Sequence, residues 1–105
     1  NEEVRQLTDK VRDSAGRKFE LVTCAYLELA KPDLATAIET VVQAGADKIT
    51  VLPYFLNSGN HVIRDIPAII NKARQNYPDC HFQVTDCIGM YEGMPELILR
   101  QVEAG

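Results

Sequence analysis

Long hydrophobic runs are absent from these 105 residues. The longest wholly apolar stretches span only a few residues, whereas a membrane-spanning helix needs about 20. The chain also lacks repeats, low-complexity tracts and long linkers. Hydrophobic residues make up 46% of the chain and charged residues 25%, as is ordinary for a globular protein. We therefore expect residues 1–105 to form a single domain with one core.

An excess of basic residues is absent as well. The formal net charge is −4 at pH 7. A net acidic surface argues against nonspecific binding to nucleic acid, so we expect no nucleic-acid partner. An anionic substrate would have to be attracted by a local cluster of cations, because the field of the whole molecule would repel it.

Cysteine is scarce, with only Cys24, Cys80 and Cys87 in the chain. An odd number of cysteines without dense spacing does not fit a disulfide framework, so we expect a reducing compartment, the cytoplasm. Cys80, His81 and Cys87 could form a site for a soft metal. Their spacing matches no C-x-x-C pattern, and we interpret the thiols as small buried hydrophobes.

Several common enzyme motifs are also missing. The sequence contains no P-loop, G-x-G-x-x-G, G-x-S-x-G or H-E-x-x-H pattern. This absence excludes the nucleotide-binding, hydrolase and zinc-protease classes that depend on these motifs.

The periodicity of apolar residues alternates between helical and strand-like along the chain. Strands that alternate with helices predict right-handed crossovers and a parallel sheet. We expect an α/β fold, a doubly wound three-layer sandwich with a mainly parallel sheet. Because the order begins with a helix, we also expect a further strand upstream of Asn1. The predicted helices cover residues 1–15, 31–45, about 61 or 65 to 76, and 95–104, and the predicted strands cover residues 19–27, 48–52 and 81–86.

Local signals support several of these boundaries. Lys31-Pro32-Asp33 is typical of a helix start. Asp65 is interpreted as the cap of the third helix, whose core-facing residues are predicted to be Ile66, Ile69, Ile70 and Ala73. Alternation of Phe82 and Val84 with polar neighbours favours an edge strand with one wet face.

Ligands of open α/β sheets bind beyond the carboxyl ends of the strands. Glu28 follows the first predicted strand, the segment from Asn57 to His61 follows the second, and the segment from Asp86 to Tyr91 follows the third. We expect all three segments to lie on one edge of the sheet.

Glu28 and His61 are the candidate chemical groups at this edge. Glu28 interrupts an apolar run, so it is either a partly buried carboxylate with a raised pKa or an exposed strand end. His61 lies in a polar loop and is either functional or merely solvated. Together they offer one oxygen and one nitrogen ligand, which suit first-row metals. Two protein ligands make an open site, from which a metal can be released.

Arg64 follows this loop and could contact an anionic group near the edge of the sheet, or it could be a solvated helix residue.

Three stretches of the sequence resemble a known family: Leu27-Glu28-Leu29-Ala30-Lys31-Pro32, the run from Val51 to Val62, and Asp65-Ile66-Pro67. They are similar to the small class II chelatases that act on sirohydrochlorin. That family includes the cobaltochelatases of cobalamin synthesis and the ferrochelatases of sirohaem synthesis. The resemblance covers essentially the whole chain, and the part from Leu52 to Pro67 is its most specific segment.

The resemblance implies a four-stranded parallel sheet, a homodimer, and insertion of cobalt, iron or nickel into sirohydrochlorin. It implies no cofactor beyond the divalent metal, which is itself a substrate. His61 would bind the metal or accept a pyrrole proton, and Glu28 would face the same cleft. The candidate substrate contacts are Gly59, Asn60, Lys31 and Arg64.

The sequence departs from the family pattern at three places. The family has an N-terminal strand that ends in His-Gly-Ser, and this motif would lie just before Asn1. Tyr91 stands where the family often has a histidine, and Lys31 stands where it usually has a glutamate. An alternative is therefore a non-catalytic module that binds a tetrapyrrole or a metal. A flavodoxin-like regulatory domain is a second alternative, but the expected acidic pocket after its first strand is not evident.

Overall fold

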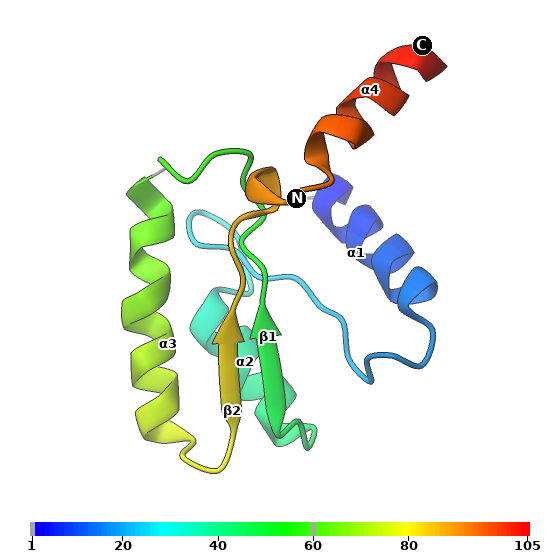
Figure 1. Ribbon diagram of the computed structural model, residues 1–105. Coiled ribbons are helices and arrows are strands. Elements are labelled where there is room, and N and C mark those ends of the chain that lie inside the picture. The colour runs from blue at the N-terminus through cyan, green and yellow to red at the C-terminus, as the bar shows by residue number, and fades with distance from the viewer. Residues whose placement is uncertain (1, 60) are drawn as a thin grey trace. The chain divides into compact units, whose positions relative to one another are not determined.

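The computed structural model describes residues 2–59 and 61–105, apart from the side chains of His61 and Val62. The chain divides into two compact units, Asn1–Asp47 and Lys48–Gly105. The first contains two helices, and the second contains a parallel sheet with its connecting and following helices (Figure 1).

The first unit consists of α1 (Glu2–Ala15), a long connecting segment and α2 (Leu34–Gln43). The predicted strand over residues 19–27 is wrong: only Tyr26 takes part in β-pairing, as an isolated bridge with Asp33. A strand requires a neighbouring strand, and the Val22 carbonyl instead accepts hydrogen bonds from the Arg12 side chain at 3.1 and 2.6 Å. The apolar run therefore predicted a strand where no strand lies beside it among the described residues.

Helix α2 begins where Lys31-Pro32-Asp33 predicted. The Asp33 side chain caps it by accepting a hydrogen bond from the Thr36 backbone N–H at 2.8 Å. Ala37 and Ile38 are its buried residues. The capped end fixes the loop that precedes the helix.

Replacing Asp33 with alanine should lower the midpoint of thermal unfolding, because Thr36 would lose its capping acceptor. Hydrogen bonds from Thr36 hold the pKa of Asp33 below its usual value. A lowered folded-state pKa gives stability that is present above the unfolded-state pKa and is lost as the pH falls through the folded-state pKa. The difference between D33A and the unaltered chain should therefore shrink between about pH 7 and about pH 2. Melting curves followed by circular dichroism would measure it.

The matched control is Asp33→Asn, since asparagine caps as well as aspartate but carries no charge. D33N should retain most of the stability at every pH. A D33A deficit that is equally large in acid would contradict the role of the ionised carboxylate.

The second unit is built on strands β1 (Lys48–Val51) and β2 (His81–Val84). They pair in parallel, with Lys48 opposite His81 and Val51 opposite Val84, and Figure 1 shows both arrows pointing the same way. The short helix η1 (His61–Arg64) and α3 (Asp65–Asn76) connect the two strands. The predicted parallel, helix-connected arrangement is confirmed for this pair.

Helix α3 supplies most of the core of this unit. Ile66, Ile70 and Ala73 are buried on one face at helical spacing, and Ile70 is only 1% exposed. Burying one such side chain contributes about 1.5–3 kcal/mol. Phe82 on β2 is buried as well, and Arg74 donates to its carbonyl at 3.2 Å. The predicted apolar stripe is thus confirmed, although Ile69 is only half-buried.

The chain ends with η2 (Ile88–Met90) and α4 (Met94–Ala104). Pro95 lies in the first turn of α4, where its missing N–H has no helical partner to lose. No described residue of α4 is buried. Across residues 2–59 and 61–105, no helix is both long and apolar enough to cross a membrane.

Candidate functional site

The carboxyl ends of β1 and β2 lead into two segments that stay side by side. The amide N–H of Thr85 donates to Val51 at 2.9 Å, that of Ile88 to Pro53 at 3.1 Å, and that of Gly89 to Phe55 at 3.0 Å. These bonds continue the pairing beyond the strands and fix the edge at which α/β sheets bind ligands.

An open hollow of about 410 Å³ lies at this edge. Among its lining residues, Cys87 is buried, whereas Tyr91 is 60% exposed. The expected position of the segment from Asp86 to Tyr91 is therefore confirmed within the second unit. Its lining residues are Leu52, Thr85, Asp86, Cys87, Ile88, Met90, Tyr91 and Glu92.

Gly89 makes the closest approach between the two segments. A Cβ atom at this position would overlap the backbone of Leu56, including its carbonyl oxygen. Only glycine permits this contact without a backbone shift. Apart from the residue type itself, nothing in the sequence indicates this requirement.

The loop after β1 reaches η1 through a tight turn. Asn57 accepts a hydrogen bond from the Gly59 N–H at 3.0 Å, and Gly59 is exposed. His61 is the first residue of η1. Asn60 and the His61 side chain lie outside the described residues, so their predicted roles stay predictions.

Arg64 and Asp65 occupy the junction between η1 and α3. Arg64 is exposed and stands at the N-cap position with helical backbone angles and no side-chain cap bond. The interpretation of Asp65 as the cap is wrong, because Asp65 is the first residue of α3 itself. Its carboxylate is still favourably placed, since the first turn carries the positive end of the helix dipole.

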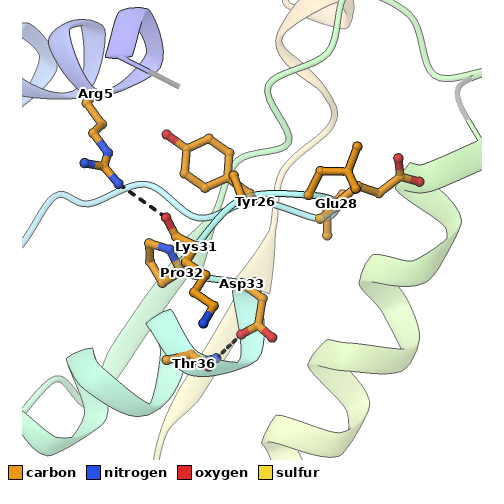
Figure 2. Close-up of a pocket in the computed structure, with 10 residues that line it drawn as sticks. Arg5, Tyr26, Glu28, Lys31, Pro32, Asp33 and Thr36 are labelled. Atoms are coloured by element: carbon orange, nitrogen blue, oxygen red, sulfur yellow. Dashed lines mark hydrogen bonds between the residues drawn. The ribbon is translucent and has the colours of Figure 1, made fainter.

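The first unit carries a second open hollow, of about 980 Å³, around the loop from Leu27 to Pro32. The Tyr26 N–H donates to the Pro32 carbonyl at 2.9 Å and closes the base of this loop. An Arg5 Nη atom donates to the Lys31 carbonyl at 3.4 Å. Figure 2 shows Arg5 reaching the loop from one side, with the Glu28 carboxylate directed to the other.

Glu28 and Lys31 are both exposed in this hollow. Of the two readings of Glu28, the structure therefore supports the exposed carboxylate and contradicts the partly buried one. Glu28 belongs to the first unit and His61 to the second, and their pairing in one site stays a prediction.

Tyr26 also lines this hollow, and the pKa of its hydroxyl group is raised. Desolvation raises the pKa of its hydroxyl above the usual value, as does the Cys24 thiol 3.8 Å away, while a hydrogen bond from Arg5 lowers it. Tyr26 therefore stays a neutral hydrogen-bonding group near neutral pH. Neither Tyr26 nor Arg5 was predicted, because their meeting depends on how a helix packs on a loop.

The cysteines form no disulfide: Cys24 and Cys80 are half-buried thiols, and Cys87 is buried. Within the described part of the chain, no cluster of three or more histidine, cysteine, aspartate or glutamate side chains could hold a metal.

Comparisons with known proteins cover nearly all of the chain. The family model of CbiX proteins matches residues 1–104. The sirohydrochlorin cobaltochelatase of Saccharolobus solfataricus is 30% identical over 99 residues, which are 89% of this chain and 77% of that protein. The sirohydrochlorin cobaltochelatase of Priestia megaterium is 31% identical over 83 residues, 79% of this chain but only 27% of that longer protein.

The structural likeness is equally extensive. The crystal structure of a CbiX protein from Marinobacter aquaeolei VT8, named for cobalamin (vitamin B12) biosynthesis, superposes with a TM-score of 0.77 at 25% identity. The superposition covers 99% of this chain and 84% of that protein. The predicted chelatase-like α/β fold and the family resemblance are confirmed, and the chain belongs to the CbiX family.

Proposed function

We propose that this chain inserts Co²⁺ into sirohydrochlorin as a step of cobalamin biosynthesis. The observation that carries the proposal is the alignment, along most of the chain, with relatives named sirohydrochlorin cobaltochelatase. The exposed Lys31 side chain in the hollow of the first unit is compatible with a carboxylate-bearing macrocycle.

The reaction exchanges two pyrrole protons for one divalent cation. We assign His61 as metal ligand or proton acceptor, since a neutral imidazole can do either near pH 7. Glu28 is the second proposed group, and its exposed carboxylate can receive the incoming cation or a proton. Such a small ligand set suits a metal that must be passed on. The metal is a substrate, and the proposed reaction needs no other cofactor.

Four residues are proposed to hold the macrocycle. Gly59 is exposed in its turn, which would let the backbone approach a flat ring. Lys31 and Arg64 are exposed cations that could pair with peripheral carboxylates. Asn60 follows Gly59 in the same loop and completes the proposed set.

We also propose a homodimer, supported by the unusual exposure of apolar side chains on α4, where Leu97 is 57%, Ile98 55% and Val102 70% exposed. Sedimentation equilibrium would test this, and a monomer at all concentrations would contradict it. A cytoplasmic setting is proposed because none of the three cysteines forms a disulfide, and fractionation of the source cells would test it. The net charge of −4 supports the absence of a nucleic-acid partner, which a DNA-binding titration would check.

The proposed function is tested by incubating the chain anaerobically with sirohydrochlorin and Co²⁺, Fe²⁺ or Ni²⁺ in parallel, and following the absorption of the macrocycle. We expect insertion of Co²⁺ well above the rate without protein. Faster insertion of Fe²⁺ would assign the chain to sirohaem synthesis instead. Binding of sirohydrochlorin without insertion of any metal would favour the non-catalytic alternative.

A further inference from the structure

Leu29 stands out in the loop from Leu27 to Pro32. It is the only non-glycine residue with a positive φ, +61°, among residues 2–59 and 61–105, and its side chain is 104% exposed. Left-handed backbone is unfavourable for a residue with a Cβ atom, and exposure of a leucine does not help folding. Folding alone therefore does not explain an exposed apolar residue with a strained backbone, and such strain is often found at functional sites.

The two ends of the loop are fixed, which explains how the strained conformation persists. Tyr26 and Asp33 form a parallel bridge, with the Tyr26 N–H bound to Pro32 at 2.9 Å. Asp33 is in turn tied to the first turn of α2 through Thr36. Leu29 lies between these anchors, lines the hollow and is fully exposed.

Arg5 brings a positive charge to the same hollow. Its contact with the Lys31 carbonyl is long, 3.4 Å, and it also donates to the Tyr26 hydroxyl. A guanidinium has five N–H donors, so these two contacts leave others for a ligand. Among the described residues, neither Arg5 nor Lys31 forms an ion pair. The Asp33 carboxylate is engaged with Thr36, and the Glu28 carboxylate points away from Arg5 in Figure 2. Arg5 is thus available to an anion from outside the protein.

We infer that this hollow binds one carboxylate-bearing arm of the tetrapyrrole, with the Arg5 guanidinium paired to the carboxylate and Leu29 in contact with the apolar ring. The planar fork of arginine matches a carboxylate through two parallel hydrogen bonds. Both residues bind and position the substrate, and neither takes part in the exchange of protons and metal. The inference rests on the proposed function, which supplies the tetrapyrrole as substrate.

The test is the dissociation constant of metal-free sirohydrochlorin, measured by absorption titration. Arg5→Gln should weaken binding about tenfold, which is the loss of a charge-assisted hydrogen-bonded pair. The dissociation constant of Arg5→Lys should lie between those of the unaltered chain and R5Q, because lysine keeps the charge but lacks the planar fork of hydrogen-bond donors. The matched control is Arg17→Gln, since Arg17 is exposed in the same unit but outside the hollow. Leu29→Ala should weaken binding a few-fold, whereas Leu21→Ala, also at an exposed leucine, should not.

A second measurement excludes a merely structural effect. With fully esterified sirohydrochlorin, the unaltered chain and R5Q should bind equally, because no carboxylate remains for Arg5. Equal binding of the free acid by R5Q and R17Q, or an R5Q deficit that persists with the ester, would overturn the inference.

The same titration separates this inference from the proposed function. If the unaltered chain binds sirohydrochlorin but inserts no metal, the proposed catalysis fails while the Arg5 comparison still decides the inference. If the unaltered chain does not bind sirohydrochlorin, both are contradicted.

Discussion

Replacing His61 with alanine should lower the rate of Co²⁺ insertion by about a hundredfold or more. Loss of a group that accepts a proton in the reaction typically costs this much, and loss of a metal ligand would add to it. His61 begins η1 two residues after the exposed Gly59, in the segment that follows the carboxyl end of β1. Initial rates with sirohydrochlorin and Co²⁺ in excess would measure the effect.

His81 provides the matched control, since it is the only other histidine in the chain. It is exposed and is the first residue of β2, at the opposite end of the strand from the ligand-binding edge. H81A should therefore retain most of the activity. A rate for H61A equal to that of H81A would remove His61 from the mechanism.

Gly89→Ala should destabilise the protein by about 3 kcal/mol, as expected for overpacking against atoms that cannot move freely. The added methyl group would overlap the Leu56 backbone, and moving Gly89 away would break the 3.0 Å hydrogen bond to Phe55. Urea unfolding would measure the free energy of unfolding. The loss should be accompanied by weaker tetrapyrrole binding, because the two segments at the carboxyl edge would separate.

Gly93→Ala is the control for the same type of change nearby. The three atoms nearest to a Cβ atom at Gly93 all belong to the ring of Tyr91, a residue that is 60% exposed and whose side chain can therefore move aside more easily than backbone. Its φ of −81° also suits alanine. Equal destabilisation by the two substitutions would contradict the close approach of Gly89 to Leu56.

The sequence predicted those parts of the fold that depend on short-range patterns. The spacing of Ile66, Ile70 and Ala73 indicated the buried face of α3, and Pro32-Asp33 indicated the start of α2. The prediction failed where the formation of a strand depends on pairing with another strand. In the described structure, the apolar run over residues 19–27 has no neighbouring strand. The prediction that Asp65 caps α3 was wrong by one position, because Arg64 at the end of η1 is the N-cap and Asp65 is the first residue of the helix.

Some residues of the candidate site could likewise be predicted from the sequence, and others could not. Residues that follow β1 and β2 could be assigned to the carboxyl edge from their position alone, and the hydrogen bonds from Ile88 and Gly89 confirm that edge. The same rule did not place Glu28, because the strand predicted before it is not formed. Arg5 could not be found by this rule, because it lies on a helix and reaches the loop through tertiary packing. The strain at Leu29 is likewise a property of backbone angles, which an apolar residue type does not reveal.

The most direct test of the central claim is the amount of cobalt–sirohydrochlorin formed when sirohydrochlorin and Co²⁺ are in large excess over the chain. A catalyst should form many molecules of product per molecule of protein, at a rate that rises in proportion to protein concentration. Formation of no more product than protein, or a rate equal to that without protein, would contradict the account.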